Sequence, residues 1–256
     1  MTFMKIAIIT GASSGLGKAF AEKIAKTGDV DELWLVARRA DRLEMLKNEL
    51  DTTVRPLVLD LGDLKSIELL EKLLEQENPD VRYLVNSAGF GKIGNYEDLT
   101  REECHGMLDI NVRALMDVTR VVLPYMSRGS RLLQLASSSA FQPLPGLSVY
   151  AATKSFVLSF TRSLRWELRG RGIHVTAVCP GWVKTEFMNV AIDSRNGNVV
   201  KHFWPFVSTS FVVNSAMLGN KLGMAVVTCG PHTFIQRVAA KILPSWLLMG
   251  IWRLIR

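Results

Sequence analysis

The stretch Lys5-Ile-Ala-Ile-Ile-Thr10-Gly11-Ala-Ser-Ser-Gly15-Leu-Gly17 decides the fold class of this chain. Lys5 to Thr10 is a short β-branched apolar run, which predicts a buried strand. Three glycines follow within seven residues, and a helical pattern of apolar residues begins directly after them. Strand, glycine turn and helix together present free backbone N–H groups and the positive end of a helix to a phosphate. The stretch therefore predicts a nucleotide site.

Context decides how this glycine turn is interpreted. Three glycines this close also occur in flexible loops, and the spacing Gly-x-x-x-Gly-x-Gly differs from the Gly-x-Gly-x-x-Gly fingerprint of many dinucleotide folds. The strand before the turn and the helix after it favour the nucleotide site, because glycine lets the backbone approach phosphates closely. The turn residues expected to contact the nucleotide are Gly11, Ser13, Ser14, Gly15, Leu16 and Gly17.

Further strands alternate with helical patterns along the chain. Their alternation predicts an α/β fold, a doubly wound, Rossmann-like parallel sheet of about seven strands with helices on both faces. The length of 256 residues fits one such domain, residues 1–240, with a substrate loop at about 186–215 and a tail at 241–256. The later strands are expected at 33–37, 54–59, 83–85, 131–136, 175–178 and 225–228, and helices at 64–76 and near 215–221.

Composition excludes several kinds of function. Lys and Arg number 31 against 24 Asp and Glu, and the basic residues are scattered apart from two short clusters, so we predict no nucleic-acid partner. Cys104, Cys179 and Cys229 lie far apart and match no metal spacing, so we predict neither a metal site nor a disulfide framework. Free thiols and a start without the features of a signal peptide predict a cytoplasmic protein.

The expected end of the second strand carries Arg38 and Arg39. In dinucleotide folds an acidic residue at this corner binds the ribose 2′-hydroxyl, whereas arginine suits a 2′-phosphate. With no carboxylate there to repel a phosphate, two guanidinium groups favour NADP(H) over NAD(H). The alternative is that both arginines are simply solvated at the start of a helix.

Polar or small residues also follow the other strands. Asp60-Leu61 is placed for an adenine amino group, and Thr185 for a cofactor amide or phosphate. Ligands of doubly wound sheets bind at the carboxyl ends of the strands, so these positions converge on one site. The cofactor contacts expected from these strand ends are Asp60, Leu61, Asn86, Ala88, Gly89, Pro180, Gly181, Val183 and Thr185.

The run Tyr150-Ala-Ala-Thr-Lys154 carries the chemistry. Residues four apart on a helix share a face, so the Tyr150 phenol and the Lys154 ammonium point into the same space. A fixed positive charge beside a phenol is expected to lower the pKa of Tyr150 and make it a better general acid and base. Ser137 ends the preceding strand, and Asn111 lies among apolar residues, where it needs partners whether it is structural or part of a site.

In these residues the chain resembles the short-chain dehydrogenase/reductase family, to about residue 230. The match comprises Thr10-Gly11-x-x-x-Gly15-x-Gly17, Asp60, Asn86-x-Ala88-Gly89, Asn111, Ser137, Tyr150-x-x-x-Lys154 and Pro180-Gly181-x-x-x-Thr185, in the family's order. It departs at Ser87, where the family has a second Asn, and at Ser14, where no basic residue supports NADP binding.

The resemblance implies a role for each of these groups. Tyr150 would protonate the carbonyl oxygen, and Ser137 would hydrogen-bond that oxygen in preference to Ser138 or Ser139. Lys154 would modify the pKa of Tyr150 and bind the nicotinamide ribose, and Asn111 would help to hold Lys154 through water. The resemblance thus implies hydride transfer between NADP(H) and a carbonyl or secondary alcohol. The alternative is a non-catalytic NADP-binding regulator on the same fold.

Apolar residues in the substrate loop and the tail suggest partners. They predict a lipid-, steroid- or aromatic-type substrate, although such side chains also simply fill cores. The tail combines apolar residues with Lys241, Arg253 and Arg256, which fits self-packing, a subunit interface in a homodimer or homotetramer, or contact with a membrane surface. The side chains expected around the substrate are Phe90, Phe187, Met188, Phe203, Trp204, Phe206 and Phe211.

Overall fold

Seven parallel strands form the central sheet of the protein, whose computed structural model describes residues 3–203 and 205–255. The strand order is β3-β2-β1-β4-β5-β6-β9, and β7 pairs with β8 in a small second sheet. The strands of the central sheet are β1 (Lys5–Thr10), β2 (Glu32–Ala37), β3 (Thr53–Val58), β4 (Asp80–Asn86), β5 (Arg131–Leu135), β6 (His174–Pro180) and β9 (Val226–Cys229).

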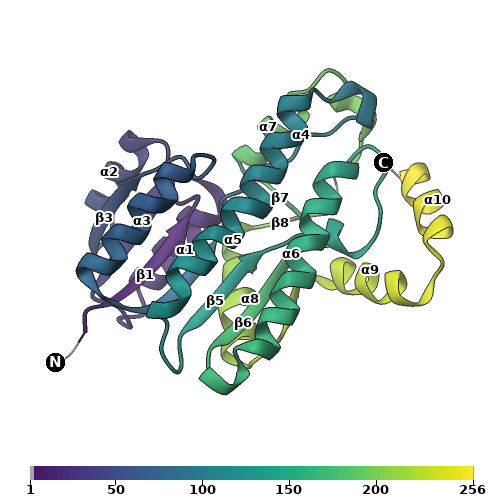
Figure 1. Cartoon of the computed structure of the whole chain (residues 1–256). Helices are drawn as coiled ribbons and strands as arrows, with labels where there is room; N and C mark the ends of the chain where they lie inside the picture. Colours follow the sequence, from purple (N-terminus) through teal and green to yellow (C-terminus); the bar gives the residue numbers. More distant parts are fainter. Residues whose placement is uncertain (1–2, 204, 256) are drawn as a thin grey trace.

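Helices cover both faces of this sheet (Figure 1). One face packs against α1 (Gly15–Ala25), α2 (Ala40–Glu49) and α8 (Thr209–Lys221). The other packs against α3 (Leu64–Glu77), α5 (Leu115–Val122) and α6 (Ser148–Glu167). The predicted doubly wound α/β fold with about seven strands is confirmed.

The four central residues of β1, 6–9, are all apolar and face both sides of the sheet. Ala7 and Ile9 belong to the core beneath α1, whereas Ile6 and Ile8 belong to the core on the opposite face. All four side chains are fully buried. A strand in the middle of a parallel sheet is covered on both faces, so it reads as a continuous apolar run.

The strand order reverses between β1 and β4. The chain runs outward from β1 to β3 and then crosses back to β4 on the other side of β1. The loops after β1 and β4 therefore leave the sheet in different directions and open a crevice, which is where ligands bind in such sheets. Thr10 ties the two loops together, since its hydroxyl accepts hydrogen bonds from the backbone N–H groups of Ser87 and Ala88, both at 3.1 Å.

A π-helical segment, Asp109–Ala114, joins α4 (Arg101–Leu108) to α5 in one continuous rod. Asn111 lies in this segment and is fully buried. π segments inside α-helices often lie at functional sites. Asn111 therefore remains a candidate site residue.

The segment after β6 is more regular than predicted. Instead of a long irregular loop at 186–215, it contains α7 (Glu186–Ile192) and the pairing of β7 (Trp182–Val183) with β8 (Phe206–Val207). The helix predicted near Ser215 begins six residues earlier, at Thr209, because the Ser208 hydroxyl caps it by accepting from Phe211 N. Trp204 and Arg256, which belong to the predicted substrate and tail residues, lie outside the described residues.

Two helices form the C-terminal part of the chain. They are α9 (Pro231–Ile242) and α10 (Ser245–Ile255), which lie to one side of the sheet (Figure 1). The expected boundary at residue 240 falls inside α9, and the chain turns instead at Leu243-Pro244. Within residues 3–203 and 205–255, a helix with the length and apolar character needed to span a membrane is not found.

Candidate active site

A cavity of about 990 Å³ opens at the carboxyl ends of the strands. It brings together most of the residues that the sequence singled out, from the first strand to the loop after the sixth. Among the predicted catalytic and cofactor-binding residues, Gly17, Asn86 and Asn111 are not part of its lining. The predicted residues that line it are Gly11, Ser13, Ser14, Gly15, Leu16, Arg38, Arg39, Asp60, Leu61, Ala88, Gly89, Ser137, Tyr150, Lys154, Pro180, Gly181, Val183 and Thr185.

The glycine turn fits a pyrophosphate. A Cβ on Gly17 would lie 2.2 Å from the Gly11 carbonyl oxygen, and a Cβ on Gly11 would lie 2.8 Å from Ala88 N. Gly11 and Gly15 also have positive φ, at 67° and 56°. The Ser14 side chain does not cap α1, so the first N–H groups of that helix are free to face the cavity. The turn therefore has the close backbone packing and the free donors that hold a phosphate group.

Asn86 and Asn111 act on the wall rather than in the cavity. The Asn86 amide donates to Thr119 Oγ1 at 2.9 Å. The Asn111 carbonyl oxygen accepts from Phe90 N at 3.0 Å, and its amide donates to Phe90 O at 2.8 Å and to Thr153 Oγ1 at 3.1 Å. Asn111 thus joins the loop after β4 to α6, the helix that carries Tyr150 and Lys154.

Arg38 and Arg39 differ in their surroundings. Arg38 is exposed, and its Nη1 lies 3.9 Å from Asp60 Oδ2. Arg39 reaches across the glycine turn, where Nη2 donates to Ser13 Oγ at 3.0 Å and to Ser14 Oγ at 2.8 Å. Its Nη1 donates to Glu186 Oε2 at 2.7 Å, and this hydrogen bond is the main reason that the pKa of Glu186 is lowered.

This contact corrects the sequence interpretation of the corner. No carboxylate was expected near the two arginines, yet the fold brings Glu186 onto Arg39 from the start of α7. Glu186 also lies 3.4 Å from Arg42 Nη2. An anion that binds Arg39 must therefore compete with a carboxylate that is 147 residues away in the sequence.

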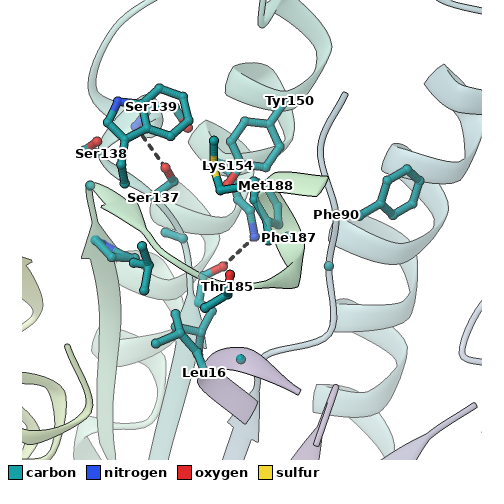
Figure 2. A pocket seen from close by; sticks show the side chains of 18 of the residues that line it. Leu16, Phe90, Ser137, Ser138, Ser139, Tyr150, Lys154, Thr185, Phe187 and Met188 are labelled. Atoms are coloured by element: carbon teal, nitrogen blue, oxygen red, sulfur yellow. Dashed lines mark hydrogen bonds between the residues drawn. The ribbon is translucent and has the colours of Figure 1, made fainter. Parts of the chain in front are cut away.

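Tyr150, Lys154 and Ser137 lie together at the end of β5 and the start of α6 (Figure 2). Lys154 Nζ lies 5.8 Å from the centroid of the Tyr150 ring and donates to Leu135 O at 2.7 Å. The Tyr150 ring contacts Phe187, at 5.6 Å between centroids. The shared helical face predicted for Tyr150 and Lys154 is present.

The expected effect of Lys154 on the acidity of Tyr150 is wrong for this structure. Burial raises the pKa of Tyr150 to about 12, and the Ser137 hydroxyl acts in the opposite direction. Burial also lowers the pKa of Lys154 to about 8. Desolvation disfavours both charged forms, and Lys154 is not among the causes that shift the pKa of Tyr150. Tyr150 is therefore protonated at neutral pH, which is the form that donates a proton.

Ser137 is better placed than its two neighbours. Its hydroxyl accepts from Ser139 N at 3.1 Å and caps the short 3-10 turn Ser138–Phe141. The Ser139 side chain is buried, and its hydroxyl has no partner. All three serines line the cavity, but among them it is the Ser137 hydroxyl that acts on the pKa of Tyr150. Ser137 therefore stays the predicted partner of Tyr150.

Lys154→Met is expected to stabilise the protein below pH 8. The pKa of Lys154 is about 8 in the folded protein and 10.5 when the side chain is exposed to water, as in the unfolded chain. Burial of the charged ammonium therefore destabilises the fold below pH 8. This destabilisation disappears as the pH rises from 8 to 10.5. The variant should gain about 1–3 kcal/mol at pH 7, after the loss of the bond to Leu135 O. Urea unfolding of variant and wild type at pH 7 and pH 10 measures the difference in their free energies of unfolding.

Burial raises the pKa values of Cys229 and Tyr150, and Lys154 is not among the causes of either shift, so their titration cancels in the difference between variant and wild type. Cys179 is coupled to Lys154, so the difference reports Lys154 together with its effect on that thiol. Lys72→Met on the exposed face of α3 is the control and should change little at either pH. A gain that is the same at pH 7 and pH 10 would contradict the buried charge.

Several residues in or next to the cavity escaped the sequence analysis. A Cβ on Gly91 would lie 2.7 Å from the Tyr150 ring, so the close packing of that ring needs a glycine. The tail also forms part of the wall through Leu243, Leu248 and Trp252. Trp252 Nε1 donates to Pro145 O at 2.9 Å, which fastens α10 to the loop before α6. The tail was read as a separate segment because its contacts are with residues about 100 positions away.

The predicted substrate side chains divide into two groups. Phe90, Phe187 and Met188 line the cavity, although the Phe90 ring points away from Tyr150 and packs on Gly106 (Figure 2). Phe203 packs edge-on against Trp182, at 5.0 Å between centroids. Phe206 and Phe211 are exposed and are not among the lining residues, so their assignment to the substrate site was wrong.

A doubly wound sheet whose cavity holds both a glycine turn that fits a phosphate and a buried Tyr150-Lys154 pair is typical of dinucleotide-dependent oxidoreductases. A family model described as short chain dehydrogenase matches residues 5–196. The chain belongs to this family, as its motifs predicted, and is an oxidoreductase that acts on CH–OH or C=O groups with NAD(P).

Individual relatives agree with this assignment. Sulfoacetaldehyde reductase 2 from Chromohalobacter salexigens is 39% identical, over 71% of this chain and 74% of the relative. NADP-dependent 3-hydroxy acid dehydrogenase from Schizosaccharomyces pombe is 39% identical, over 78% of this chain and 81% of the relative. The structure of a short-chain dehydrogenase from Sphingobium yanoikuyae in complex with NADPH superimposes with a TM-score of 0.79 at 27% identity, over 99% of this chain and 97% of the other.

Proposed function

We propose that the protein is an NADP(H)-dependent reductase of apolar ketones or aldehydes, working reversibly on the corresponding alcohols. The observation that carries this proposal is that a single cavity joins the glycine turn and Arg38-Arg39 to Tyr150 and to a wall of apolar side chains. The similar fungal dehydrogenase is named as NADP-dependent, and the similar Sphingobium structure contains NADPH.

The bound nicotinamide supplies or accepts the hydride. In reduction the Tyr150 hydroxyl donates its proton to the carbonyl oxygen, and its raised pKa keeps that proton in place at neutral pH. The Ser137 hydroxyl hydrogen-bonds the same oxygen and orients it toward Tyr150. Lys154, which is held by Leu135 O, binds the cofactor ribose next to Tyr150. Asn111 acts as a positioning residue through Phe90 and Thr153.

The apolar wall supports the substrate class. Leu144, Leu147 and Phe187 line the cavity around Tyr150, and Leu248 and Trp252 close it from the tail. Such a wall suits a lipid-, steroid- or aromatic-type carbonyl, since apolar pockets bind ligands mainly by removing apolar surface from water.

NADPH oxidation across a panel of carbonyls tests the function. The panel should contain aryl, long-chain and steroid ketones beside sulfoacetaldehyde and short 3-oxo acids, and NADH should be run in parallel. We expect kcat/KM for the best apolar ketone to exceed that for the short acids by at least about tenfold, because each buried methylene adds about 0.8 kcal/mol. Faster turnover of the short acids would reject the apolar class, and tight NADPH binding without turnover of any carbonyl would favour the non-catalytic regulator.

We also propose a cytoplasmic location for the enzyme. The three free cysteines support it, because free thiols persist in reducing compartments. We also propose a homodimer or homotetramer. The exposed Met116 and Phe156 on α5 and α6, which cover the same face of the sheet, support it, since neighbouring exposed apolar side chains mark contact surfaces.

A further inference from the structure

The net charge of this chain is concentrated at its C-terminal end. Residues 1–193 contain 24 basic and 24 acidic residues, and Asp193 is the last acidic residue of the sequence. The whole formal charge of +7 therefore belongs to residues 194–256. The basic residues of that part are Arg195, Lys201, Lys221, Arg237, Lys241, Arg253 and Arg256. A surface built from this part attracts anions over a wide area.

The same part of the chain exposes large apolar side chains. On α9 they are Phe234, Ile235, Val238 and Ile242, whose spacing places them on one face of the helix. On α10, Trp246 is 71% exposed and Leu254 is 86% exposed, and they share a face with Arg253. In Figure 1 these two helices form the yellow arm at the edge of the molecule. Apolar surface on this scale marks an interaction site.

This apolar surface continues into the active-site cavity. Ile235 on α9, Leu243 in the turn, and Ile251 and Ile255 on α10 are exposed, and all four also line the cavity. Leu248 is buried, and Trp252 is bound to Pro145 O, so α10 is anchored to the body of the enzyme by one face while the other stays open. A partner that covers the arm therefore covers the cavity mouth.

We propose that α9 and α10 dock on an anionic lipid surface, with their apolar side chains among the acyl chains and their cations at the headgroups. Amphipathic helices with Trp and Leu on one face and Lys or Arg beside it bind such surfaces. A second copy of this chain fits less well, because a twofold contact would bring the same unopposed cations together. Docking would let an apolar carbonyl compound enter the cavity directly from the lipid, and this consequence rests on the proposed function.

Vesicle co-sedimentation of the full chain tests the docking without any need for turnover. We expect binding to phosphatidylcholine vesicles that contain phosphatidylglycerol to exceed binding to pure phosphatidylcholine vesicles by at least about tenfold, and to weaken in high salt. The double variant Trp246→Ser, Leu254→Ser should lose about tenfold or more of the binding to the anionic vesicles. Neither side chain lines the cavity, so NADPH binding serves as the check on folding.

A matched variant controls for loss of apolar surface. Trp166 on α6 is as exposed as Trp246, at 71%, and Leu222 is 69% exposed. The pair Trp166→Ser, Leu222→Ser should bind vesicles like the wild type. Equal binding by both double variants, or no preference for phosphatidylglycerol in the wild type, would overturn the proposal. So would light scattering that shows a wild-type oligomer and a monomeric Trp246→Ser, Leu254→Ser variant with unchanged vesicle binding, since the arm would then be a subunit interface.

Discussion

Tyr150→Phe is expected to lower kcat for carbonyl reduction by about 10²- to 10⁴-fold, the usual contribution of a positioned general acid. The substitution removes the hydroxyl and keeps the ring, which packs against Phe187 and Gly91. The affinity for NADPH should therefore change by less than about threefold, because the cofactor contacts of the glycine turn and of Lys154 remain. Single-turnover reduction and fluorescence titration with NADPH measure the two quantities.

Tyr96→Phe is the matched control. Tyr96 lies at the surface, and it does not line the cavity. Removal of its hydroxyl should leave turnover unchanged. If Tyr150→Phe kept near wild-type turnover with normal NADPH binding, another group would have to supply the proton, and the assigned role would be lost.

Arg39→Ala is expected to raise the KM for NADPH by about 10- to 100-fold, which corresponds to the loss of one or two hydrogen bonds to a charged group. The KM for NADH should change by less than about threefold, because NADH lacks the 2′-phosphate that the guanidinium would bind. Arg39 lines the cavity and is already held over Ser13 and Ser14. Initial rates with both cofactors at saturating ketone measure the effect.

Arg42→Ala separates a specific contact from general electrostatics. Arg42 pairs with the same Glu186 carboxylate as Arg39 but does not line the cavity. Its loss changes the charge of this region equally and should leave the ratio of the two KM values within about threefold of wild type. Equal effects of the two substitutions, or equal losses with NADPH and NADH in Arg39→Ala, would argue against a 2′-phosphate contact.

Most of the fold and much of the cavity could be predicted from the sequence because the signals are local. A buried strand, a glycine turn and a helix occupy consecutive residues, so Lys5 to Gly17 are sufficient to predict the start of a doubly wound sheet. The ends of parallel strands then bring Asp60, Ser137 and Thr185 to one edge. Spacing alone also placed Tyr150 and Lys154 on one helical face.

The wrong predictions concern properties that depend on the surroundings of a residue in the folded protein and not on the spacing of residues in the sequence. Spacing does not reveal how deeply Tyr150 and Lys154 are buried, and burial reverses the expected shift in the pKa of Tyr150. Phe206 and Phe211 have the composition of pocket residues but are exposed. The start of α8 was misplaced because Ser208 caps a helix whose first turn carries little apolar periodicity.

The sequence by itself determined the α/β sheet, the nucleotide turn and the pairing of Tyr150 with Lys154, because each depends on residues that are neighbours along one strand, turn or helix. Asn111 and Ser137 became catalytic candidates only through the resemblance to a known family. Only the tertiary structure decided that Glu186 lies against Arg39, that desolvation controls Tyr150 and Lys154, and that the tail forms a wall of the cavity. These features depend on contacts between residues far apart in the chain and on the exclusion of water, which exist only once the chain has packed.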